Sequence, residues 1–194
     1  MLGLEVSKIA NRVVLSYRSK GLIKQLRPIF KDMPDYVFND TIRNNLSLGG
    51  QDWINELVEN WQDSGLSLED YAVYAADHDS DNLFSLLNYK WSEEVIKVNL
   101  YDFTKETRDL IFERDFGRKN PNGVPRDEER TNLQREKATG DGQNEPVVVV
   151  MDGRKYNLIE GWHRTMALLE SGKNGSPDPL KWGKVKIRAW VGKK

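Results

Sequence analysis

Apolar residues recur at helical spacing through roughly the first ninety residues of the chain. The stretch from Asp52 to Gln62 is the clearest case, because its apolar residues form one wide face and Gly65 follows as a helix stop. The stretch from Asp32 to Gly50 contains a proline, several asparagines and a glycine pair, so we expect it to be mostly loop. Helices are predicted over residues 4–18, 22–30, 52–62, 67–76 and 82–88.

The pattern changes at Val95, where apolar and polar residues begin to alternate as they do in half-buried strands. The run from Pro146 to Val150 is instead β-branched and uncharged, which is typical of a buried strand. A turn at Asp152-Gly153 joins that run to the next apolar segment and predicts a hairpin. Strands are predicted over residues 95–100, 147–150, 156–159 and 185–191.

Helices are also expected in this half of the chain. Thr104 is a good cap for a helix that ends near Phe116, before Gly117. The long polar segment from Arg118 to Glu145 is expected to be loop with one helix over 128–137, and a loop of this length beside a site is typical of a lid or binding segment. The pattern as a whole predicts an α+β chain, with a helical region over residues 1–94 and a small mixed-sheet domain over residues 95–194.

A single glycine separates the last strand of the hairpin from the next predicted helix. Gly161 follows the strand, and the first turn of the helix carries His163 and Arg164. Such a turn directs backbone N–H groups and the positive end of the helix dipole at one point. An imidazole and a guanidinium at the same point make a natural phosphate site.

The residues around this turn resemble a known motif. Glu160-Gly161-Trp162-His163-Arg164-Thr165-Met166-Ala167 is similar to the signature Gly-x-His/Arg-Arg-x-x-Ala of the ParB/sulfiredoxin-like superfamily, and the preceding hairpin and following helix agree with it. The resemblance extends over residues 95–191 and implies a ParB/sulfiredoxin-like fold, of the ParB-like nuclease domain type, for the sheet domain. Sulfiredoxin chemistry is excluded, because Trp162 stands where that family has its cysteine nucleophile and the chain contains no cysteine. The long DNA-partition proteins are disfavoured, because they add a helix-turn-helix domain after this core and only a short tail follows here.

Fold membership in this superfamily leaves three functions open. The first hypothesis is a ParB-like domain that handles a phosphate-bearing ligand, a nucleotide or a nucleic acid, as a nuclease or NTPase. The second is a small-molecule or protein kinase on the same fold. The third is a non-enzymatic binding or structural protein, a phage or other viral protein, that kept the fold and lost the chemistry.

The motif residues have distinct expected roles. Arg164 holds a phosphate bidentately, His163 hydrogen-bonds it or moves a proton, and Gly161 and Thr165 complete the phosphate site with backbone and hydroxyl groups. An acidic residue precedes the glycine in the kinase-like members of the superfamily, so the resemblance assigns Glu160 to a catalytic or metal-binding role, with Mg²⁺ and a nucleotide as cofactors. The alternative is structural: Arg164 and Glu160 form a local ion pair, and His163 caps the helix. Trp162 is expected to be a packing residue.

The net charge of the chain is −1, but the charged residues are distributed unevenly along it. The last block, from Asp152 to Lys194, has ten Lys and Arg residues against four Asp and Glu. Lys184, Lys186 and Arg188 alternate along the last predicted strand, which places them on one face as a candidate nucleic-acid-binding stripe. The alternative is that these basic residues pair with the acidic segment from Asp32 to Glu94, which has fourteen acidic residues against two basic ones.

The composition limits which covalent links, metal sites and cellular locations we expect for the protein. The absence of cysteine excludes disulfides and thiolate metal sites. No apolar run reaches the roughly 18–20 residues that span a bilayer, and the N-terminus lacks the apolar core of a signal peptide, so we expect no membrane span. A cytoplasmic location follows, in the host cytoplasm or the virion if the protein is virus-encoded. The N-terminal helical region is a candidate surface for a protein partner, although packing on its own domain explains the pattern as well.

Overall fold

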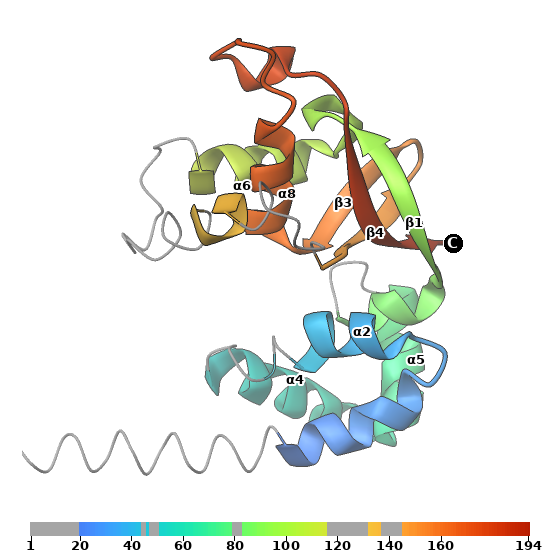
Figure 1. Ribbon diagram of the computed structural model, residues 1–194. Helices are drawn as coiled ribbons and strands as arrows, with labels where there is room; N and C mark the ends of the chain where they lie inside the picture. The colour runs from blue at the N-terminus through green and yellow to red at the C-terminus, as the bar shows by residue number, and fades with distance from the viewer. Residues whose placement is uncertain (1–19, 44–45, 47–50, 79–82, 116–131, 137–144) are drawn as a thin grey trace, which may run out of the picture. The chain divides into compact units, whose positions relative to one another are not determined.

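The chain forms two compact units, Met1–Tyr89 and Lys90–Lys194 (Figure 1). The computed structural model describes residues 20–43, 46, 51–78, 83–115, 132–136 and 145–194. The helix predicted over 4–18 and most of the polar segment before Glu145 lie outside these residues. Every regular element described in the first unit is helical, and the second unit contains a four-stranded mixed sheet. The chain is therefore a mixed α/β protein.

The first unit is built from short helices. The predictions over 52–62, 67–76 and 82–88 are confirmed with modest changes in length. The loop predicted from Asp32 to Gly50 is wrong in its middle, because helix α2 begins directly after Pro34 and continues as a π-helix. The described elements are a helix over 20–29, α2 (Asp35–Val37), the π-helix η1 (Phe38–Arg43), α4 (Gln51–Ser64), α5 (Leu68–His78) and the 3₁₀-helix η2 (Leu83–Asn88).

Aromatic rings form the centre of the first unit. Phe30 and Phe84 stack with ring centroids 6.0 Å apart, and Tyr71 meets Phe84 edge-on at 5.9 Å. Phe38, the first residue of the π-helix, packs its ring against Phe30 at 6.1 Å. Ring pairs of this kind contribute about 0.5–1.5 kcal/mol beyond their buried area. The unexpected helix therefore exists because its apolar residues complete this core, which local propensity does not reveal.

The second unit is organised by the sheet, whose strand order is β1-β4-β2-β3. β2 and β3 form the predicted hairpin, and Gly153 at its turn has φ 58°. β4 pairs with β1 in antiparallel and with β2 in parallel orientation, so the sheet is mixed as expected. The strands are β1 (Lys90–Val98), β2 (Val147–Asp152), β3 (Lys155–Glu160) and β4 (Val185–Lys193). β1 thus begins five residues before the predicted start at Val95.

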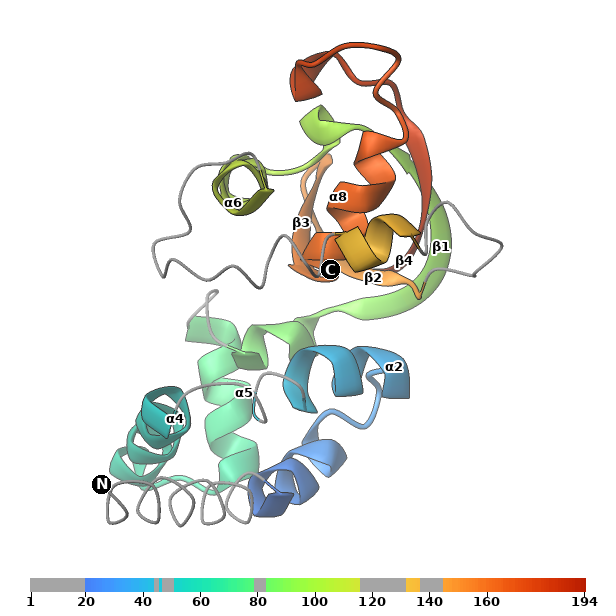
Figure 2. The ribbon, with the colours of Figure 1, turned by 60° about the vertical axis from the view of Figure 1, so that its left-hand side comes forward.

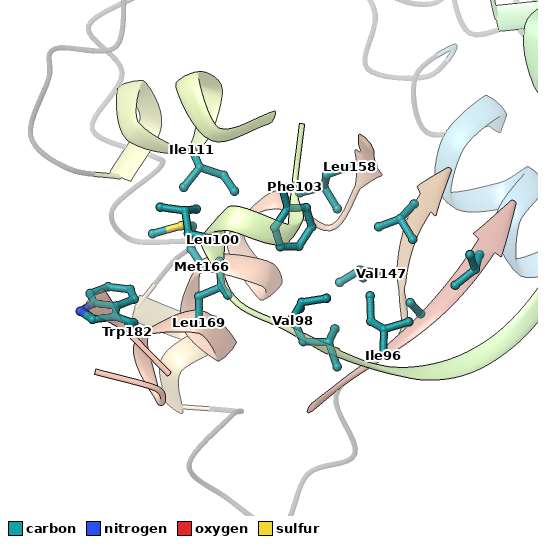
Figure 3. Packing of buried hydrophobic residues seen from close by; sticks show 14 residues of the cluster. Ile96, Val98, Leu100, Phe103, Ile111, Val147, Leu158, Met166, Leu169 and Trp182 are labelled. Atoms are coloured by element: carbon teal, nitrogen blue, oxygen red, sulfur yellow. The ribbon is translucent and has the colours of Figure 1, made fainter. Parts of the chain in front are cut away.

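Two helices pack with the sheet to form the core of the second unit (Figure 2). They are α6 (Lys105–Asp115) and α8 (Trp162–Glu170), and the 3₁₀-helices η3 (Leu100–Asp102) and η4 (Pro179–Lys181) lie in the connections. Figure 3 shows Met166 and Leu169 of α8 within the buried cluster that also contains strand residues. Burying each such side chain contributes about 1.5–3 kcal/mol, so α8 is fixed mainly by its apolar face.

A small polar network fixes α6 to the hairpin. Thr104 caps α6 as predicted, since its hydroxyl accepts a hydrogen bond from the Thr107 N–H at 3.3 Å. The Thr107 hydroxyl donates to the Asn157 side-chain oxygen at 2.9 Å and accepts from the Leu158 N–H at 3.0 Å. These contacts join the start of α6 to β3, the strand that leads into Gly161.

Candidate phosphate site at the Gly161 turn

Gly161 makes the turn between β3 and α8, and only glycine fits there. Its φ of 95° lies in the left-handed region, which L side chains avoid. A Cβ at this position would lie 2.9 Å from Val147 Cγ1 and 3.1 Å from Val147 Cβ. The backbone of the turn is therefore pressed against β2, and the strand-to-helix turn expected from the sequence is confirmed.

The start of α8 has the polarity that favours an anion. Gly161 provides no side-chain cap, and the first turn of the helix carries no acidic residue. Thr165 N–H donates to the Gly161 carbonyl at 2.8 Å, which closes the first helical turn. Just before the helix, Glu160 Oε1 accepts a hydrogen bond from the Gly161 N–H at 3.0 Å. Glu160 is thus held at the turn by the backbone of the next residue.

Arg164 folds back over this turn. It is 8 % exposed, and its Nε lies 3.3 Å from the position a Cβ on Gly161 would take. Its Nη1 donates to Glu145 Oε2 at 2.8 Å. The Glu145 side chain is 74 % exposed, so a buried guanidinium presents one of its nitrogens to a carboxylate that reaches in from solvent. Because charge-assisted bonds of this type are strong and directional, the position of Glu145 Oε2 marks where Arg164 holds an anionic oxygen.

Glu145 was not selected from the sequence. It is the last residue of the long polar segment and directly precedes Pro146, where the buried strand run begins. The only signal in the sequence is an acidic residue at the junction of a long polar segment and a core strand. The Arg164–Glu145 pair joins residues nineteen positions apart, and no local spacing rule predicts it.

The other motif residues are divided between the surface and the core. His163 is half-buried in the first turn of α8, and Trp162 packs against the core cluster as expected. Thr165 is fully buried, and its hydroxyl has no hydrogen-bond partner among the described residues. A ligand in solvent does not reach that hydroxyl, so the contribution of Thr165 to the turn comes from its backbone.

The described residues contain no group of three or more His, Asp or Glu side chains that could hold a metal ion on its own. Mg²⁺ in proteins often takes one or two carboxylates and completes its shell with water and ligand phosphates. Glu160 fits that requirement only together with a bound phosphate. Within the part of the chain that the structure describes, no helix is long and apolar enough to cross a membrane.

The basic residues of β4 have the predicted alternation, with Ile187 buried between the exposed Lys186 and Arg188. Lys184 Nζ lies 3.0 Å from an Asp102 carboxylate oxygen, and Arg188 pairs with Glu93. Lys186 is exposed and lies opposite Lys97 in the register of β1 and β4. Two of the three stripe residues therefore already have acidic neighbours within the second unit.

A scan against protein-family models finds no match for this chain, and searches of curated proteins and of solved structures find none either. The resemblance to the ParB/sulfiredoxin-like superfamily thus rests on the motif residues and on the hairpin and helix that flank them, and function has to be argued from the geometry of the Gly161 turn.

Proposed function

We propose that the second unit binds a phosphate-bearing ligand, a nucleotide or a nucleic acid, at the Gly161 turn. The observation that carries the proposal is the contact of the buried Arg164 guanidinium with the exposed Glu145 carboxylate at 2.8 Å. In this reading the Glu145 carboxylate stands in for a phosphate oxygen. The resemblance of the surrounding residues to the ParB/sulfiredoxin-like motif supports the same assignment.

A phosphate can replace the Glu145 carboxylate at Arg164 with little cost in free energy. Most of the Glu145 side chain is already in water, so releasing it from Arg164 exposes little new charge and costs little. Arg164 is largely buried, so its charge depends on a nearby anion more than the exposed Glu145 carboxylate depends on a nearby cation. A phosphate offers more oxygens than a carboxylate and a greater charge, and the positive end of α8 adds to its attraction.

An enzymatic form of the proposal gives Glu160 a role at the same turn. The carboxylate lies beside Gly161 N, where it can act as a base or bind Mg²⁺ that accompanies a phosphate. Glu160→Gln then abolishes nuclease, NTPase or kinase turnover while binding is largely kept. If wild-type protein shows no phosphate release, transfer or DNA cleavage with any nucleotide and divalent metal, the non-enzymatic form of the proposal stands.

Two substitutions with opposite expected effects test the site. The wild type is titrated with ATP, CTP, GTP and a DNA duplex, each with and without Mg²⁺. Arg164→Met should weaken binding by about 1.5–3 kcal/mol, the range for a hydrogen bond to a charged group. Glu145→Gln should strengthen binding, because the competing carboxylate is gone while the side-chain shape is kept.

A matched control is available at the other end of the same helix. Arg135 forms an ion pair with Glu170, the last residue of α8. Arg135→Met removes an arginine–glutamate pair of the same kind without touching the Gly161 turn, so binding should stay at the wild-type level. Absence of binding by the wild type to every ligand, or equal affinity of the Arg164 and Arg135 variants, would refute the proposed function.

A further inference from the structure

One edge of the sheet is a long, regular strand. β1 stands at the end of the strand order, and β4 is its only strand neighbour among the described residues (Figure 1). It pairs with β4 over nine consecutive residues without a register shift, and it contains no proline. Natural proteins usually shorten, bulge or interrupt such edges, because the unpaired backbone groups bind other strands. β1 carries charged residues but is neither short, bulged nor interrupted, so its free edge can accept a further strand.

The side chains on one face of β1 indicate which kind of strand could pair with it. Ile96 and Val98 face the core, so Glu93, Val95 and Lys97 share the opposite face. Val95 is 64 % exposed, more than any other large apolar residue that the structure describes. An acidic, an apolar and a basic residue thus follow one another along the edge at equal spacing.

We propose that β1 pairs in antiparallel orientation with β1 of a second copy of this chain, in a two-fold dimer centred on Val95. In such a pair, opposite residues share a face, so the two-fold axis passes through a residue position. With Val95 at the centre, Val95 meets its own copy, and Glu93 lies opposite Lys97 of the second copy. The symmetry repeats the Glu93–Lys97 pair, so the dimer contains it twice.

Neighbouring registers are disfavoured by the same sequence. A centre at Glu93 or at Glu94 brings two identical carboxylates face to face. A centre at Ile96 places Val95 opposite Lys97 and forms no pair of opposite charges. Cross-strand pairs of opposite charge stabilise a sheet and like charges destabilise it. Of these registers, the one centred on Val95 places opposite charges across from each other and pairs Val95 with its own copy.

The charges of the single chain are arranged to accept this pairing. Lys97 has no ion-pair or hydrogen-bond partner among the described residues, and it lies opposite Lys186, a like charge. Both nitrogens of Arg188 that contact Glu93 bind the same oxygen, Oε1. The second oxygen, Oε2, has no partner within the described part of the chain. In the dimer it meets Lys97 of the second copy, which also relieves the repulsion between Lys97 and Lys186.

The test is the mass in solution, measured by sedimentation or light scattering over a concentration series. The wild type should approach twice 22.4 kDa as concentration rises. Glu93→Lys and Lys97→Glu should each raise the dimer Kd on the order of ten- to a hundredfold, since two attractive pairs become repulsive. An equimolar mixture of the two variants restores both pairs and should dimerise as the wild type does.

Controls separate this interface from folding defects and from any other contact. Lys97→Glu removes no hydrogen bond or ion pair among the described residues, so its circular dichroism and melting temperature should match those of the wild type. Arg154→Glu makes the same charge change in the exposed β2–β3 turn and should leave the dimer intact. A wild type that stays at 22.4 kDa, or a mixture no more dimeric than its separate components, would overturn the proposal.

Discussion

Replacing Gly161 with alanine gives the most precise test of how the turn is built. At φ 95° an L residue adopts a left-handed conformation that costs roughly 1–2 kcal/mol. The added Cβ also lies 2.9 Å from Val147 Cγ1, and overpacking of this kind costs roughly 1–3 kcal/mol. Alanine also lowers the conformational entropy of the unfolded chain, which offsets about 0.4–1 kcal/mol of this loss of stability. The second unit should therefore lose about 2–4 kcal/mol of unfolding free energy.

Calorimetry should detect this change as a lower melting temperature for the second unit. At about 4–8 °C per kcal/mol for a domain of this size, the expected decrease is roughly 10–25 °C. Gly153→Ala is the matched control, because Gly153 also has a positive φ but nothing lies within 4 Å of its Cβ position. Gly153→Ala should therefore lose only the stability that the left-handed backbone conformation costs. If the two variants melt within about 2 °C of each other, contact with Val147 does not determine the turn.

The contact itself is measured by a double-mutant cycle. Val147→Ala removes Cγ1, the nearer of the two Val147 atoms that the new Cβ would meet, and keeps Cβ; it also leaves a small cavity, since Val147 is completely buried. In the double variant, part of the Gly161→Ala penalty should disappear, with a coupling of about 0.5–3 kcal/mol. Purely additive effects would contradict the steric explanation.

Three further predictions address other parts of the second unit. Thr165→Val should raise the unfolding free energy by about 1 kcal/mol in chemical denaturation, because a methyl group replaces a buried hydroxyl that has no hydrogen-bond partner among the described residues; a loss of stability would show that the hydroxyl is satisfied. A hydrogen bond from Lys193 is the main cause that lowers the pKa of Glu94 from its ordinary value, so the stabilisation is present near neutral pH and is lost as pH falls through the lowered pKa. Glu94→Gln should remove that part of the acid sensitivity, and an unchanged pH profile of denaturation would contradict it. If β4 contacts nucleic acid, replacing Lys184 and Lys186 together should lower the slope of log affinity against log salt by about one rather than two, because Lys184 already has an acidic neighbour; an unchanged slope would remove β4 from the interface.

Sequence reasoning predicted the local elements of the second unit well, because their signals are local. The β-branched run of β2, the glycine at the hairpin turn and the threonine cap of α6 each act within a few residues. The start of β1 was missed because Trp91, Ser92 and two glutamates do not alternate, and the strand is formed there by pairing with the end of β4. Pairing with a segment almost a hundred residues away is a tertiary effect.

The first unit shows the same limit. Pro34 and the nearby asparagines indicate a loop in any local analysis, yet a helix begins immediately after that proline. Proline is well tolerated at a helix start, and Phe38 and Ile42 are then buried in the aromatic core. The benefit of burying them depends on rings supplied by Phe30 and Phe84, which the local sequence does not contain.

The backbone turn of the candidate site was predictable from the sequence, but its side-chain contacts were not. The glycine turn and the position of Arg164 at the start of α8 follow from the motif. Burial of Thr165 follows from the rotation of α8 against the sheet, which the motif does not specify. The carboxylate that meets Arg164 comes from Glu145, and only the folded chain brings the two together.

The most direct test of the account is to locate a bound phosphate by nuclear magnetic resonance. Backbone amide spectra of ¹⁵N-labelled wild type and of Arg164→Met are recorded during titration with ATP and with a short DNA duplex. The largest shifts should occur at Gly161, His163 and Arg164 and at Glu145, whose carboxylate is displaced, and the variant should lose them. Shifts confined to other parts of the chain, or the same shifts in the variant, would contradict a phosphate site at the Gly161 turn.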